Sequence, residues 1–251
     1  PLYFTLISSF KDDQSIFSHF FAPPATWMVE NYEKAESMIH ILRAAGNSLL
    51  VSAVSIALML AVAMMGAYAV SRRIVPGSGG IHTLLLAAMM IPIQAAIVPV
   101  VQMVNAVNLS DNLLALSVVY AGINLSMVFL ILKNSIDSIP RDLDEAATID
   151  GCGPFRTLRH VILPASKPAV ATCAIISFLS IYNELPLANV LIRTKELRTV
   201  SQALLNLKGD FGTLYGISFA AIVVSVIPTL LMYLLAQEKV EKSICASSVK
   251  G

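Results

Sequence analysis

The run AAGNSLLVSAVSIALMLAVAMMGAYAVS, from Ala44 to Ser71, has no charged side chain and is bounded by Arg43 and Arg72. About 20 apolar residues are enough to cross the hydrocarbon core of a bilayer as a helix. The run therefore predicts a transmembrane helix over 46–70 and places the chain among the membrane proteins.

The composition of the whole chain agrees with this interpretation. Of its 251 residues, 56% are hydrophobic and only 13% are charged, and the mean hydropathy is +0.74. A soluble domain has about 25% charged residues, so part of this surface must face lipid. The net charge of +1 gives no indication of nucleic-acid binding, and we expect none. We predict an all-α membrane protein with a single transmembrane domain over 1–251.

Other charge-free runs predict the remaining transmembrane helices. Together with the first run they indicate five complete spans, at 46–70, 81–104, 112–132, 168–192 and 212–237. Residues 1–10 are apolar but too few to cross a bilayer. We interpret them as the outer end of a first helix whose beginning is missing from this sequence, which makes six helices in all.

The basic residues predict which side each loop faces. Of the 17 Lys and Arg residues, ten flank the spans on one side and seven on the other. Cytoplasmic loops carry the excess of Lys and Arg. The loop 134–166 and the tail 238–251 are therefore predicted to be cytoplasmic, and the loops 11–45 and 193–211 external.

The cytoplasmic loop has the strongest local signals. It contains Glu145-Ala146-Ala147-Thr148-Ile149-Asp150-Gly151, followed by Val161-Ile162-Leu163-Pro164. Ser138 as a cap, a proline and three acids predict the start of a short helix, and Gly151 predicts its left-handed end. A second short helix is predicted to begin near Pro154, with Phe155, Leu158 and Ile162 on one face, and to break at Leu163-Pro164.

A plain amphipathic loop lying on lipid headgroups is one interpretation of this segment. The spacing favours another. Glu-Ala-Ala at 145–147, Gly151, Val161 and Leu163-Pro164 resemble the EAA loop of binding-protein-dependent ABC importers, with Val in place of the usual Ile. The stretches Ser138-Ile139-Pro140 and Tyr182-Asn183-Glu184 also resemble the carbohydrate-type permeases of that family, and the maltose-type inner-membrane subunits in particular.

The resemblance implies a fold, a location and a set of partners. It implies the six-helix permease fold of type I importers, in the bacterial cytoplasmic (inner) membrane. In that family two permease subunits pair, here as an expected heterodimer, and each EAA loop docks on one subunit of an ATPase dimer. A solute-binding protein delivers the solute from outside. The docking residues implied for this chain are Glu145, Ala146, Ala147, Asp150, Gly151, Leu163 and Pro164.

The chain is not expected to be an enzyme. It has no Gly-x-x-x-x-Gly-Lys-Ser/Thr phosphate loop, so ATP and Mg²⁺ would be bound by the partner ATPase. We expect no cofactor of its own, no catalytic residue and no metal site, because its four His residues are scattered singly.

Four polar residues within the predicted spans are candidates for the substrate pathway, because polar groups in a membrane often serve function. They are Gln94, Asn124, Asn183 and Glu184. Hydrogen bonding between helices is the alternative for the first two. For Glu184 the alternative is a carboxylate that reaches the external interface.

Two other classes of protein remain as alternatives. A secondary transporter working alone often has inverted repeats and broken half-helices, and no repeat is visible here. A membrane enzyme needs a cluster of nucleophile, base or metal ligands, and none is visible in the spans. The solute itself is open: a sugar or oligosaccharide is favoured by resemblance over a polyol, a glycerol phosphate ester or a peptide.

Overall fold

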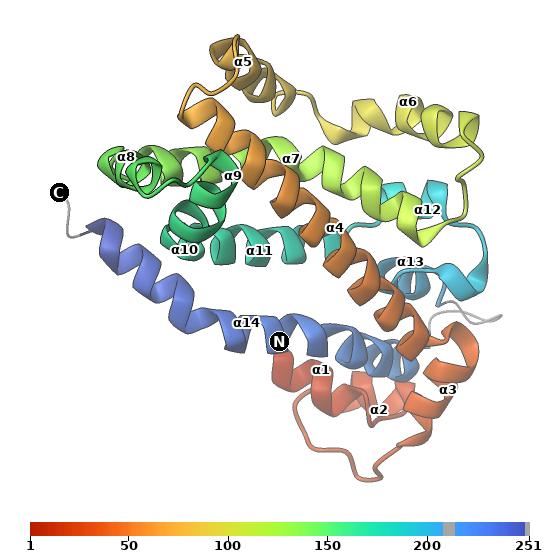
Figure 1. Ribbon diagram of the computed structural model, residues 1–251. Helices are drawn as coiled ribbons and strands as arrows, with labels where there is room; N and C mark the ends of the chain where they lie inside the picture. Colours follow the sequence, from red (N-terminus) through yellow and green to blue (C-terminus); the bar gives the residue numbers. More distant parts are fainter. Residues whose placement is uncertain (208–213, 249–251) are drawn as a thin grey trace.

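The computed structural model describes residues 1–207 and 214–248, and the side chains of the last of these only as far as residue 234. All regular structure within these ranges is helical (Figure 1). The end of the predicted loop 193–211, the first two residues of the predicted helix 212–237 and the last three of the tail 238–251 lie outside the described residues. By length and hydropathy, three helices are able to cross a membrane, and five segments are if each bent pair counts as one span.

The centre of the molecule is a pair of long helices, α4 (Ile41–Ser71) and α7 (Leu113–Asp137), which lie side by side (Figure 1). Small residues on α4, such as Ala63 and Ala67, let the helices approach closely, and Phe129 and Leu132 of α7 are fully buried against them. The third long helix is α14 (Tyr215–Ser248), which contains Pro228. These helices form the frame that positions the loop 134–166 and the described part of the loop 193–211.

The segment predicted as one helix over 81–104 is two helices. α5 (Ser78–Ala88) and α6 (Ile93–Ala106) are bent by 106° at the break between them. Pro92 has an extended backbone at this break, while Pro99 lies inside α6. A proline removes one backbone donor and disfavours a helical residue before it, so the break occurs at Pro92. No side chain of α5 is buried, and Val104 alone is buried on α6.

The segment predicted as one helix over 168–192 is also interrupted. α11 (Lys167–Tyr182) ends before Glu184, and α12 (Pro186–Leu191) follows. The two carboxylate oxygens of Glu184 accept hydrogen bonds from the backbone N–H groups of Leu187 (2.8 Å) and Ala188 (3.2 Å). Glu184, just before the N-cap Leu185, thus satisfies two N–H groups in the first turn of α12, and Pro186 fits the first position of that turn.

The predicted external loop 11–45 is largely helical. After α1 (Leu2–Ser8) come α2 (Asp13–Ser18) and α3 (Glu30–Ile39), and α4 begins already at Ile41. His40, in a left-handed conformation (φ 48°), separates α3 from α4. On the same side, η2 (Lys195–Leu197) and α13 (Val200–Leu205) follow α12.

Candidate functional site

The loop at 138–166 begins with α8 (Asp142–Ile149), which has three acids in its first turn. Negative side chains at a helix N-terminus are favoured by the helix dipole. The prediction that Ser138 caps this helix was wrong: Ser138 ends α7, its hydroxyl donates to the Ser135 carbonyl (2.7 Å), and α8 starts after Arg141 without a side-chain cap.

The left-handed end of α8 is confirmed at Gly151, which has φ 78°. The N–H of Gly151 donates to the Thr148 carbonyl (3.0 Å), and the N–H of Cys152 donates to the Ala147 carbonyl (2.8 Å). This pair of bonds is the Schellman motif, which satisfies the last carbonyls of a helix. A Cβ at position 151 would meet no atom within 4 Å. Replacing this glycine therefore destabilises the turn through the left-handed backbone conformation, which other residues adopt less readily.

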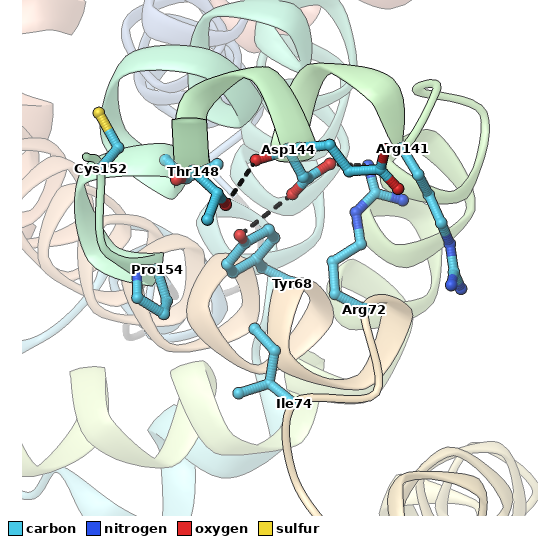
Figure 2. Close-up of a pocket in the computed structure, with 10 residues that line it drawn as sticks. Tyr68, Arg72, Ile74, Arg141, Asp144, Thr148, Cys152 and Pro154 are labelled. Carbon is cyan, nitrogen blue, oxygen red and sulfur yellow. Dashed lines mark hydrogen bonds and ion pairs between the residues drawn. The ribbon is translucent and has the colours of Figure 1, made fainter. Parts of the chain in front are cut away.

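The inner face of α8 is fastened to the end of α4 by Asp144 (Figure 2). Tyr68 Oη donates to Asp144 Oδ1 (3.1 Å), and Arg72 Nη2 lies 2.8 Å from Asp144 Oδ2. Arg72 also donates to the carbonyl of Ile139 (3.1 Å). Only 8% of the Arg72 side chain and 18% of the Asp144 side chain are exposed. We name Tyr68, Arg72 and Asp144 the fastening cluster.

The fastening cluster was not predicted from the sequence, in which Asp144 is only one of three acids at a helix start. The adjacent pocket of about 360 Å³ lies between α4, α8 and the segment after Gly151, and Glu145, Thr148 and Cys152 also line it. Among the described residues no group of three His, Cys, Asp or Glu side chains could hold a metal ion.

The outer face of α8 is uncovered. Glu145, Ala146 and Asp150 are exposed, and so are the apolar side chains of Leu143 (45%) and Ile149 (87%). Ala147, by contrast, is buried within the chain (6% exposed). The structure thus places six of the seven predicted docking residues at the surface and turns Ala147 inward.

The second half of the loop departs from the prediction in two ways. It consists of α9 (Pro154–Thr157), the π-helical turn η1 (Leu158–Ile162) and α10 (Leu163–Ala165). Leu158 and Ile162 are buried, but Phe155 is 67% exposed rather than on their face. The helix also continues through Leu163-Pro164, both exposed, and turns at Ser166, where α11 begins with a bend of 76°.

The four pathway candidates have different surroundings. Gln94 is exposed on α6. The amide of Asn124 donates to the Tyr120 carbonyl (2.9 Å), and that of Asn183 donates to the Leu179 carbonyl (2.8 Å). The Tyr120 hydroxyl donates to Glu184, which also accepts from the first turn of α12. Tyr120 therefore connects two of the candidates, and Glu184 has an internal structural role.

Comparisons with known proteins agree with one another. A family model described as "Binding-protein-dependent transport system inner membrane component" matches residues 61–244. The chain is 33% identical to the diacetylchitobiose uptake system permease protein NgcG of Streptomyces coelicolor, over 97% of this chain and 82% of the relative. It is 29% identical to the multiple sugar-binding transport system permease protein MsmG of Streptococcus mutans, over 100% of this chain and 91% of the relative.

A solved structure has the same fold. A chain of a bacterial ABC transporter involved in the import of the acidic polysaccharide alginate superimposes with a TM-score of 0.84, at 20% identity, over 95% of this chain and 89% of that one. The helical arrangement in Figure 1 is thus the fold of that transporter chain.

Proposed function

The chain belongs to the inner-membrane components of binding-protein-dependent transport systems, and from this membership we propose that it imports a sugar or an oligosaccharide. It is a multi-pass permease subunit of an ATP-driven importer, a transport component and not a catalyst. The names of the diacetylchitobiose and multiple-sugar relatives support a carbohydrate as the solute.

The observation that carries the proposed mechanism is the two-sided character of α8. Its inner face is fixed to α4 by the fastening cluster. Its outer face leaves Glu145, Ala146 and the 87% exposed Ile149 uncovered. An exposed apolar patch edged by charge is typical of a protein interface. We assign this outer face to one subunit of an ATPase dimer, which binds ATP and Mg²⁺.

In this mechanism Glu145 offers a carboxylate to a basic group of the ATPase, and Ala146 permits close approach. The docking segment ends at α8 with Asp150 and Gly151, and at α10 with Leu163-Pro164. Closure of the ATPase dimer then pushes α8, and the 2.8 Å ion pair between Asp144 and Arg72 passes this movement to α4.

Two further partners complete the proposed transporter. A second permease subunit, different from this one, would form the other half of the pathway, and lipid would surround both. A solute-binding protein would deliver the sugar at the external side, near the loop 193–211. Gln94, Asn124, Asn183 and Glu184 remain the proposed pathway residues.

Two substitutions test the docking role. Gly151→Asp puts a side chain on a left-handed backbone, a conformation that Asp adopts less readily than Gly, and adds an acid to the outer face. Glu145→Lys reverses the charge that meets the ATPase. We expect both variants to insert into the membrane but to lose most of the co-purifying ATPase and of the uptake. Glu33→Lys, the same reversal at an exposed position of α3, is the matched control.

Normal ATPase recovery and normal uptake in both variants would overturn the docking assignment. The solute is tested separately, by uptake of sugars, polyols, glycerol phosphate esters and peptides with the matching solute-binding protein. Uptake of a non-carbohydrate alone would overturn the sugar assignment and leave the docking role intact.

A further inference from the structure

A second pocket, of about 300 Å³, lies where α4 and α7 end and α5 begins. Arg73, His82, Lys133 and Arg141 line it from four different segments. The single acid among the lining residues is Asp137. Basic side chains from separate segments therefore meet around one hollow, and we name it the basic pocket.

The charge in the basic pocket is not balanced by its own acid. Asp137 accepts from the Ser71 hydroxyl (2.5 Å) and from the Lys133 ammonium (2.6 Å), so its carboxylate is already paired. Among the ion pairs of the described residues, none involves Arg73 or Arg141. Two guanidinium groups at one pocket, without an acid of their own, favour an anion there.

The backbone keeps Arg73 at this place. Arg73 has a left-handed conformation (φ 56°), which is uncommon for a residue with a side chain. Its N–H donates to the Val70 carbonyl (3.2 Å), and the chain then turns through Gly77 (φ 74°) into α5. Such strained residues persist where the surrounding structure holds them and often mark functional positions.

The position of the basic pocket indicates the kind of anion. The apolar helices α4 and α7 both end at its wall, at Ser71 and Asp137. The neighbouring α5 buries no side chain and exposes Leu84 (70%). With α4 and α7 as membrane spans, this end of both helices is at the headgroup layer, on the side predicted to be cytoplasmic. Basic pockets on the cytoplasmic side of a membrane protein bind lipid headgroups.

We propose that the basic pocket binds a phosphate group, supplied by an anionic phospholipid of the cytoplasmic leaflet. Arg73 and Arg141 would bind the phosphate oxygens, with Lys133 and His82 at the side. The inference depends on the membrane location and on the predicted orientation of the loops, and it does not depend on the docking of α8.

The test uses the intact transporter complex, purified in detergent and examined by native mass spectrometry. The probes are phosphatidylglycerol, phosphatidylcholine and inorganic phosphate, each added alone. The variants are Arg73→Gln with Arg141→Gln, and Arg73→Lys with Arg141→Lys. The matched control is Arg156→Gln with Arg159→Gln, which removes two exposed charges from the loop that holds Arg141 but outside the basic pocket.

We expect the wild type to retain phosphatidylglycerol in preference to phosphatidylcholine. The double variant Arg73→Gln with Arg141→Gln (the Gln pair) should reduce this retention roughly tenfold or more, because it removes the contribution of two cations at a membrane surface. The Lys pair and the control should keep it, and unchanged assembly of the Gln pair would show that the complex is intact.

Binding of inorganic phosphate without retention of phosphatidylglycerol would keep the phosphate site and assign its ligand to a soluble anion. Equal retention of both lipids with no phosphate binding would overturn the proposal. So would an equal loss in the Gln pair and in the control, because retention would then follow total charge. The measurement involves neither uptake nor ATP, so its failure leaves the proposed transport function untouched.

Discussion

The loop that carries α8 and the outer segment, residues 192–203, are both polar connections between helices, but they are fixed in opposite ways. The outer segment is held at several points: the Asn47 amide donates to the carbonyls of Glu196 (2.9 Å) and Arg198 (3.0 Å), and the Ser48 hydroxyl accepts from the N–H of Val200 (2.8 Å). α8 is held by side chains chiefly at Asp144, and its other face is uncovered.

This difference indicates what each region is built for. A segment held along its length keeps one shape, because each bond that is lost leaves the others in place. A helix held at one buried cluster moves with the helix to which the cluster belongs. α8 is thus suited to transmit a push to α4, and the outer segment is suited to remain a fixed platform.

The largest effect is expected when the single fastening of α8 is removed. Asp144→Ala leaves the Arg72 guanidinium, 8% exposed, without its ion partner. Breaking one partner of a buried ion pair costs about 3–5 kcal/mol. We expect a lower melting temperature of the purified complex and loss of uptake. Tyr68→Phe removes only one neutral donor and should have a much smaller effect.

Asp142→Ala is the matched control, since Asp142 is an exposed acid on the same helix. The double variant Arg72→Leu with Asp144→Leu removes both charges and should recover much of the stability without recovering the coupling. If Asp144→Ala transports normally, the movement of α4 does not depend on the fastening cluster. The proposal that α8 transmits movement to α4 through this cluster would then be wrong.

The same contrast shows how far the sequence could predict the site. Gly151 was predictable, because a left-handed helix end favours a residue without a side chain, wherever the rest of the chain lies. The role of Asp144 was not, because Arg72 and Tyr68 are distant in sequence and the meeting of α4 with α8 is a matter of tertiary packing.

The fold was predictable to a similar degree. Hydropathy located the apolar segments. A proline such as Pro92 favours a kink, but nothing local to Pro92 predicts a bend of 106°. For the same reason Glu184 was interpreted as a pathway or interface acid. In the structure its carboxylate accepts hydrogen bonds from the first turn of α12 and from Tyr120 of α7, and the contact with Tyr120 depends on tertiary packing.

A second prediction concerns the start of α14, on the same side as the outer segment. A Cβ added to Gly216 would overlap the carbonyl oxygen of Lys11 and would lie 2.9 Å from Nδ2 of Asn31. Because a backbone atom cannot rotate away, Gly216→Ala should destabilise the protein by about 1–3 kcal/mol. Thermal unfolding of the solubilised protein measures this.

Gly122→Ala is the control, because a Cβ at Gly122 meets nothing within 4 Å. This change should be neutral or should stabilise α7 by up to about 1 kcal/mol. A similar response to both substitutions would contradict the close packing of α14 against the corner formed by α1, α2 and α3.

The smallest effect is expected at Asp111, which joins the loop before α7 to the outer segment. Its carboxylate accepts from the Thr194 hydroxyl and from the N–H groups of Arg193 (2.8 Å) and Thr194 (3.0 Å). The hydroxyl bond, followed by the two backbone bonds, lowers the pKa of Asp111 below its ordinary value of 3.8. A lowered pKa in the folded state adds stability above pH 3.8, and this is lost as the pH falls through the folded value.

Asp111→Asn keeps the shape and an acceptor oxygen, and Asn tolerates the left-handed backbone (φ 58°) of this position. Because the group is partly exposed and screened by solvent, the loss at neutral pH should be below about 1 kcal/mol. The melting temperatures of wild type and variant should differ at pH 6 and converge below pH 3.8, where the wild-type carboxyl is increasingly protonated. A difference that persists unchanged at low pH would show that shape, and not charge, holds the outer segment. The segment would then be fixed chiefly by the neutral bonds of Asn47 and Ser48, which do not titrate.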